Sequence, residues 1–195
     1  NISMGEYMRQ MEMDRTKQLE SILLNRLTTN YTYFMREPKH FDFLREKILP
    51  NIKPEWGRIS YQIWCAGCSS GEECYTLAML LQDYKDQGGW LPSFSIVGTD
   101  ISEQALAVAQ KGRYPVRELE NIPALWQQKY LSMDEAGTSF DIGRAIREKV
   151  RFQRMNLLKP SVGLGQYDLV LCRNVMIYFN EESRKKLIEK LYRAL

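Results

Sequence analysis

Residues 59–74 read ISYQIWCAGCSSGEEC, an apolar run that leads into a glycine-rich turn and then into acidic residues. The run carries no charged side chain before the turn, as is typical of a strand buried on both faces of a parallel sheet. Behind the turn, apolar residues recur at helical spacing, namely Cys74, Leu77, Ala78, Leu81 and Tyr84. The stretch therefore predicts a strand, a tight turn and a helix.

The rest of the chain repeats this alternation. We expect strands over residues 60–67, 94–100, 149–156 and 167–174. We expect helices over residues 72–85, 102–112, 121–131 and 180–195. Ser102 is a suitable N-cap for the second of these helices, and Gly112 a suitable C-terminal stop. Strands separated by helices pair in parallel with right-handed crossovers, so the sequence predicts an α/β fold with a doubly wound, mostly parallel sheet.

The N-terminal part of the chain is also predicted to be helical. Apolar residues at helical spacing indicate one helix over residues 14–27. A second helical run contains Phe41, Leu44, Ile48 and Leu49 and stops at Pro50. The first residue is not methionine, and the last residues lie inside an amphipathic run without a helix breaker. We therefore expect the sequence to be cut at both ends.

The composition and net charge of the chain limit the binding partners and the cellular compartment that fit it. The 195 residues carry a net charge of +3, which is too mild to indicate nucleic acid, and no apolar run approaches the roughly 20 residues that span a bilayer. Four cysteines in apolar surroundings favour a reducing, cytoplasmic setting. Residues 144–154 are locally basic, and both a solvated surface and a docking surface for an acidic partner fit this pattern.

Cys65 and Cys68 form a CxxC pattern, which raises the question of a metal or redox site. A structural zinc site needs four ligands, and no second pair follows. Cys74 is expected on the apolar face of a helix and Cys172 within a strand, while the single histidine, His40, is remote in sequence. A redox CxxC belongs at a helix N-terminus, whereas strand residues and a glycine turn intervene here. We predict no metal site.

The turn and the following strand instead favour a nucleoside cofactor. Gly67 and Gly71 would let the backbone approach a ligand at the carboxyl edge of a parallel sheet. Asp100 closes the second strand, where it could accept hydrogen bonds from ribose hydroxyl groups, although it could also cap a helix. The turn lacks both the dinucleotide fingerprint and a phosphate-binding lysine, which makes S-adenosylmethionine a better candidate than NAD or ATP.

Three stretches point to a family. They are TTNYTYFMRE (28–37), GCSSGEECYTLAM (67–79) and LCRNVMIYF (171–179). In this order, and with GTDIS and MNLL between them, they resemble the CheR-type chemotaxis receptor methyltransferases. The resemblance runs from about Leu19 to the end of the chain. It implies a fold of the S-adenosylmethionine-dependent methyltransferase (Rossmann-like) type and a protein-glutamate O-methyltransferase that acts in chemosensory signal transduction.

The resemblance also implies the site. The cofactor contacts would be Asn30, Thr32, Arg36, Gly67, Glu73, Asp100, Asn156, Leu157, Arg173 and Asn174. The catalytic pair would be Arg36 and Tyr178. Taken alone, Arg36 could equally form a surface ion pair with Glu37 or Asp42, and Tyr178 could be a core aromatic residue. Glu73 would receive the ammonium group of the cofactor, although an acid is favourable in the first turn of a helix in any case.

The resemblance carries expectations about domains and partners. Residues 1–28 would be the remnant of an N-terminal helical domain and residues 29–195 an incomplete methyltransferase domain. A small β-rich subdomain would be inserted at about 131–153, but it lacks the glycine-rich loop of members that grip a receptor peptide. The partner would be the cytoplasmic helical region of methyl-accepting chemotaxis receptors, and the protein would be a cytoplasmic monomer without nucleic acid and without membrane insertion.

Two other functions remain open on the residues alone. One is a methyltransferase of the same fold that acts on a small molecule. The other is a non-catalytic module that binds S-adenosylmethionine in signalling. A carboxylate nucleophile is already ionised at neutral pH, so the chemistry needs no general base, in keeping with a predicted site that has no histidine or cysteine nucleophile.

Overall fold

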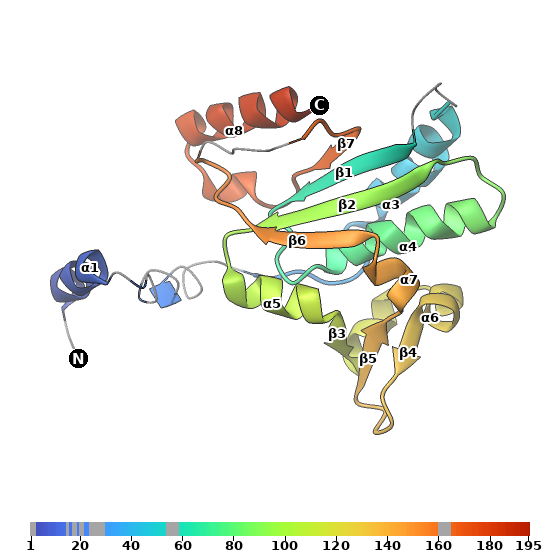
Figure 1. Ribbon diagram of the computed structural model, residues 1–195, viewed down its shortest axis with the longest axis horizontal. Helices are drawn as coiled ribbons and strands as arrows, with labels where there is room; N and C mark the ends of the chain where they lie inside the picture. Colours follow the sequence, from blue (N-terminus) through green and yellow to red (C-terminus); the bar gives the residue numbers. More distant parts are fainter. Residues whose placement is uncertain are drawn as a thin grey trace.

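The computed structural model describes residues 3–14, 16, 19, 22–23, 30–53, 59–159 and 165–195. At its centre lies a four-stranded parallel sheet with the strand order β6-β2-β1-β7 (Figure 1). The strands are β1 (Ser60–Ala66), β2 (Ser93–Asp100), β6 (Val150–Arg154) and β7 (Leu169–Leu171). The α/β class and the parallel sheet expected from the sequence are confirmed.

Three helices follow the strands and cover the sheet. They are α4 (Glu72–Asp86), α5 (Glu103–Lys111) and α8 (Glu181–Ala194). In Figure 1, α4 and α5 lie on one side of the sheet and α8 on the other. Ser102 caps α5 by accepting from the Ala105 amide, and Gly112 ends it in the left-handed conformation, as expected from the sequence.

Strand β1 is buried on both faces and contributes to two cores. Ile63 and Cys65 belong to the larger apolar cluster, which includes the buried face of α4. Trp64 and Ala66 belong to a smaller cluster that includes Leu187 of α8. Alternate side chains of a strand point to opposite faces of its sheet, so this one strand joins both layers. The indole of Trp64 donates to Thr99 Oγ1 at 2.9 Å, which satisfies its polar atom inside the core.

β7 differs from the strand expected over residues 167–174. It is shorter, and Leu169 and Val170 are only partly buried. An almost fully apolar run such as residues 167–174 predicts a strand buried on both faces, which is wrong for Leu169 and Val170 because β7 is the last strand in the described sheet order.

A smaller antiparallel sheet lies beside the α4 and α5 layer. It has the strand order β3-β5-β4, from β3 (Arg113–Pro115), β4 (Leu131–Met133) and β5 (Ser139–Ile142). The short helices around it are η3 (Val116–Asn121), α6 (Ala124–Tyr130) and α7 (Arg144–Arg147). A β-rich insertion before the third strand of the main sheet is therefore present. Its strands begin at Arg113, earlier than the expected 131–153, and residues 150–153 belong to β6.

The N-terminal part contains α1 (Met4–Met13), which the sequence analysis did not anticipate. The helix expected over residues 14–27 lies largely outside the described residues. Helical structure resumes at α3 (Pro38–Phe43) and continues through a π-helical turn, η1 (Leu44–Ile48), into a 3₁₀ turn, η2 (Leu49–Asn51). Within the described ranges, no helix has both the length and the hydropathy that crossing a bilayer requires.

Candidate active site

A cavity of about 430 Å³ opens at the carboxyl edge of the parallel sheet. Loops that follow β1, β2, β6 and β7 form most of its wall, and the segment 30–36 closes the remainder. The carboxyl edge is where open α/β sheets bind ligands, beside the point at which the strand order reverses. The eleven residues of the predicted site all line this cavity: Asn30, Thr32, Arg36, Gly67, Glu73, Asp100, Asn156, Leu157, Arg173, Asn174 and Tyr178.

The loop after β1 has the backbone that its glycines suggest. Gly67 has a φ of 81°, and its amide donates to the Thr99 carbonyl at 2.8 Å. A Cβ on Gly67 would lie 2.3 Å from Val175 Cγ2, so only glycine fits between the two loops. Gly71 does not line the cavity. It packs against Ala109 with a φ of 93°, so the expectation that it lets the backbone approach a ligand is wrong.

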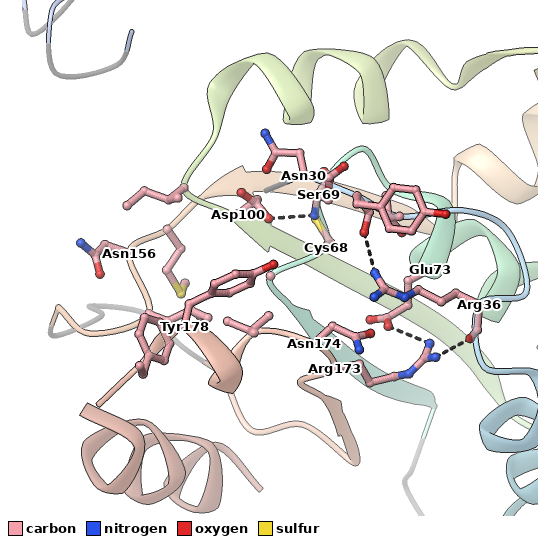
Figure 2. Close-up of a pocket in the computed structure, with 18 of the residues that line it drawn as sticks. Asn30, Arg36, Cys68, Ser69, Glu73, Asp100, Asn156, Arg173, Asn174 and Tyr178 are labelled. Atoms are coloured by element: carbon pink, nitrogen blue, oxygen red, sulfur yellow. Dashed lines mark hydrogen bonds and ion pairs between the residues drawn. The ribbon is translucent and has the colours of Figure 1, made fainter. Parts of the chain in front are cut away.

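Asp100 stands at the end of β2 and is 8% exposed. Its Oδ2 accepts from the amide of Ser69 at 2.8 Å (Figure 2), and its Oδ1 accepts from the amide of Ser102 at 2.9 Å. The carboxylate therefore caps the start of α5 and fixes the loop after β1 at the same time. A carboxylate has about four lone-pair sites, so Asp100 has the capacity to accept further donors from the cavity.

Glu73 in the first turn of α4 forms an ion pair with Arg173, which follows β7. Arg173 Nη1 lies 3.0 Å from Glu73 Oε2, and the two side chains are only 11% and 13% exposed. Burial raises the pKa of Glu73, and the guanidinium of Arg173 opposes that rise. The carboxylate predicted to receive an ammonium group is thus already held by a guanidinium.

Further groups surround Arg173. Its guanidinium stacks on the ring of Phe41, with 5.0 Å from Cζ to the ring centroid. It also donates to the carbonyl of Arg36, to Glu37 Oε2 at 3.1 Å and to His40 Nδ1 at 3.1 Å. Sequence reasoning did not place Glu37 or His40 at the site. Glu37 is the last residue of the stretch 28–37 that carries the family resemblance, and His40 lies four residues from Arg36.

Arg36 extends from a strained turn toward the cavity. Its neighbours Met35 and Glu37 both have positive φ values, 57° and 55°, which non-glycine residues adopt at a cost of about 1–3 kcal/mol each. The guanidinium of Arg36 donates to the Tyr31 carbonyl and lies over the rings of Tyr31 and Tyr33, at 5.5 and 5.9 Å from the centroids. Among the described residues, the surface ion pair considered for Arg36 with Glu37 or Asp42 is not formed.

Tyr178 lies in the 3₁₀ turn η4 (Met176–Tyr178) at the cavity wall. It is 59% exposed, so the alternative of a core aromatic residue is wrong. Tyr31 is also exposed, whereas Phe34 is fully buried. The cavity thus has exposed aromatic groups on two separate segments.

The other predicted residues also lie on the cavity wall, and their contacts differ. Asn30 holds the loop after β1, since its carbonyl accepts from Ser69 Oγ at 3.1 Å. Asn156 accepts from the Leu158 amide at 2.9 Å, and Asn174 has a φ of 57°. Leu157 is buried in the smaller core, and Thr32 lies on the wall formed by the segment 30–36.

The cysteines are structural. Cys65 and Cys74 are fully buried in the larger core, where burial raises the pKa of the Cys74 thiol well above its usual range. Cys68 is buried as well and lines the cavity. All four cysteines are free thiols.

The donor set of the cavity fits S-adenosylmethionine. Asp100 and Glu73 supply carboxylates at two places, one suited to ribose hydroxyl groups and one near a cationic centre. Ile101, Met155 and Leu157 supply apolar surface next to Asp100, suited to a purine ring. The cavity volume lies within the range of about 300–1,000 Å³ that is usual for small-molecule sites.

The chain is similar to known proteins over most of its length. A chemotaxis protein methyltransferase of Borreliella burgdorferi is 40% identical over 172 residues, covering 86% of this chain and 60% of the relative. Chemotaxis protein methyltransferase 1 of Pseudomonas aeruginosa is 31% identical over 99% of this chain and 71% of the relative. The chain thus spans about two thirds of their length. A solved structure, PKMT2 from Rickettsia typhi in complex with AdoHcy, is 15% identical, with a TM-score of 0.47 over 85% of this chain and 25% of that one.

The family model described as CheR methyltransferase, SAM binding domain matches residues 30–195, which include the whole parallel sheet and every residue of the predicted site. The chain therefore belongs to the CheR methyltransferase family.

Proposed function

We propose that the chain methylates glutamate side chains of methyl-accepting chemotaxis receptors. The observation that carries this proposal is the convergence of the eleven predicted residues on one cavity, with Arg36 and Tyr178 both in its wall. The proposed partner is the cytoplasmic helical region of the receptors, which places the reaction in the cytoplasm. The names of the relatives support a chemotaxis role.

The proposed reaction needs little acid–base chemistry from the protein. S-adenosylmethionine supplies a methyl group on a sulfonium, so that its C–S bond breaks as a C–O bond to the glutamate forms and a neutral thioether leaves. The attacking carboxylate has an ordinary pKa near ~4.3 and is ionised at neutral pH. Opposite charges disappear in this step, so the protein contributes mainly by aligning the groups and excluding water.

Arg36 is proposed to orient the incoming carboxylate. A guanidinium can hold a carboxylate through two parallel hydrogen bonds, and in the structure Arg36 is held in place by Tyr31 and Tyr33. Very tight pairing would stabilise the bound reactant as much as the transition state, which assigns Arg36 to positioning the nucleophile rather than to charge stabilisation. Tyr178 is proposed to hydrogen-bond the same carboxylate or to lie beside the sulfonium, since its ring borders the cavity.

Asp100 and Glu73 are proposed to hold the two ends of the cofactor. Asp100 has its orientation fixed by two backbone amides and would accept from the ribose hydroxyl groups. Glu73 would receive the ammonium group while it remains next to Arg173. Asn30, Thr32, Gly67, Asn156, Leu157, Arg173 and Asn174 are proposed to complete the binding surface.

The test is transfer of labelled methyl from S-adenosylmethionine to receptor cytoplasmic fragments, compared between the wild-type chain and R36A. We expect label on the fragment that base releases as methanol, and a large loss of transfer in R36A. Base-stable label, or full transfer by R36A, would contradict the proposed chemistry. Labelled product formed without receptor would indicate a small-molecule substrate, and binding of S-adenosylhomocysteine without any transfer would indicate a non-catalytic module.

A further inference from the structure

Glu37 connects two segments of the cavity wall that are far apart in the sequence. Its Oε2 accepts from Arg173 Nη2 at 3.1 Å, and its Oε1 accepts from Asn174 Nδ2 at 3.1 Å. One carboxylate therefore uses both of its oxygens on two consecutive residues of the loop after β7. Glu37 itself does not line the cavity, whereas Arg36, Arg173 and Asn174 do.

The backbone on both sides of this contact is strained. Glu37 has a φ of 55° and Asn174 a φ of 57°, both in the left-handed region. Such conformations persist where surrounding contacts hold them, and they occur most often at functional sites. The contacts of Glu37 can hold such conformations in place, because they join the strained residue Glu37 directly to the strained residue Asn174.

Glu37 accepts the hydrogen bonds from Arg173 and Asn174 as a charged carboxylate. The hydrogen bonds from Asn174 and then from Arg173 lower the pKa of Glu37, so it is ionised at neutral pH. A hydrogen bond in which one partner is ionised is stronger than a bond between neutral groups. His40 Nδ1 accepts from Arg173 Nε at 3.1 Å and lies 3.3 Å from Glu37 Oε2, so His40 belongs to the same cluster of side chains.

We infer that Glu37 is a positioning residue, which acts on the cofactor through Arg173 and Asn174. By holding both side chains, it fixes the loop after β7 against the segment that carries Arg36. Because Arg173 also holds Glu73, the placement of that carboxylate depends on Glu37 as well. The inference rests on the proposed function, since it assumes that the cavity binds S-adenosylmethionine.

The decisive variant is E37Q, measured by calorimetric titration with S-adenosylhomocysteine. Glutamine has one acceptor oxygen, and its amide nitrogen would face another donor, so one of the two contacts is lost together with the charge. We expect the Kd to rise about tenfold while the midpoint of thermal unfolding changes little. The matched control is E46Q, the same change at an exposed glutamate of the neighbouring helical segment, which should bind as the wild type does.

A second variant separates positioning from folding. N174G removes the amide donor but keeps a residue that accepts a φ of 57°. If Glu37 acts through Asn174, E37Q should weaken binding less in the N174G background than in the wild type, which a double-mutant cycle measures. A merely structural role would instead lower the unfolding midpoint of E37Q and leave the Kd of the folded protein unchanged.

The results of these experiments separate failure of the proposed role of Glu37 from failure of the proposed function. Wild-type chain that binds S-adenosylhomocysteine, with E37Q binding equally well, would overturn the inference alone. Additive effects of E37Q and N174G would overturn the part of the inference in which Glu37 acts through Asn174. A wild-type chain that does not bind S-adenosylhomocysteine would overturn both the proposed function and the role of Glu37.

Discussion

Arg173 and Glu73, a hundred residues apart in the chain, form an ion pair of 3.0 Å at the wall of the cavity. The pair joins the loop after β7 to the first turn of α4, the helix that follows β1, and β1 is the strand with which β7 pairs. Its partners are both largely shielded from water, so each charge depends on the other.

R173A is therefore expected to destabilise the fold as well as the site. Removing one partner of a buried ion pair typically costs about 3–5 kcal/mol, because the remaining charge is left uncompensated in an apolar environment. Urea unfolding should show a lower free energy of unfolding for R173A, while R193A, which removes an exposed arginine of α8, should behave as the wild type does. Equal stability of R173A and the wild type would contradict the burial argument.

Glu72 gives a prediction about pH. It is 5% exposed, and burial raises its pKa to about 7, while Ser70 and the backbone oppose the rise. The folded state thus binds a proton more tightly than the unfolded state, so this group reduces stability as pH rises from about 4.5 to 7, by up to about 3 kcal/mol. E72Q should be more stable than the wild type at pH 8 and show little difference at pH 4.

The measurement is urea unfolding of both chains across that pH range, with E120Q as an exposed control nearby. A constant difference between E72Q and the wild type at all pH values would show that the carboxylate of Glu72 does not titrate in this window.

Alanine substitutions at Gly67 and Gly88 form a matched pair that separates a steric clash from backbone strain. G67A places a methyl group 2.3 Å from Val175 Cγ2 and strains a φ of 81°. Gly88 has a similar φ, 88°, but open space around it, so G88A carries the backbone strain without the clash. We expect G67A to weaken binding of S-adenosylhomocysteine at least tenfold and G88A to leave it unchanged. Partial recovery in G67A/V175A would assign the loss to the clash, and loss of binding in G88A would argue against it.

Asp100 is expected to contribute both to the stability of the fold and to binding of the cofactor. D100N replaces one acceptor oxygen by an amide that faces a backbone N–H, so either the Ser69 or the Ser102 contact is lost. An unsatisfied buried polar group costs about 1–3 kcal/mol, which we expect as lower stability together with weaker binding of S-adenosylhomocysteine. D42N, at an exposed aspartate, is the control. Unchanged binding by D100N would remove Asp100 from the proposed ribose contacts.

The sequence predicted the sheet and the place of the site because both follow from short-range patterns. A strand such as β1, which has no charged residue and ends in an apolar run, is expected to be covered on both faces, and strand–helix alternation then leaves few topologies. Residues that directly follow parallel strands meet at one edge, so Gly67 and Asp100 could be assigned to one cavity without knowing any distance, whereas Asn156 and Arg173 were assigned to it by the family resemblance.

What the sequence could not predict depends on contacts between distant segments. Glu37 is 136 residues from Arg173, and its role follows from a left-handed backbone that no pattern near it specifies. Gly71 is required by its contact with Ala109 on α5, which only the packed structure shows. The strand β3 is three residues long and ends in proline, too short for periodicity to detect.

The burial of β1 on both faces has a consequence for how the protein opens. Because Ile63 and Cys65 contribute to one apolar cluster while Trp64 and Ala66 contribute to the other, neither layer can separate without exposing this strand. Its backbone amides should therefore be among the slowest in the molecule to exchange with deuterium, at a rate set by global unfolding. Local fluctuations that admit a ligand at the carboxyl edge can then occur while the strand itself stays closed.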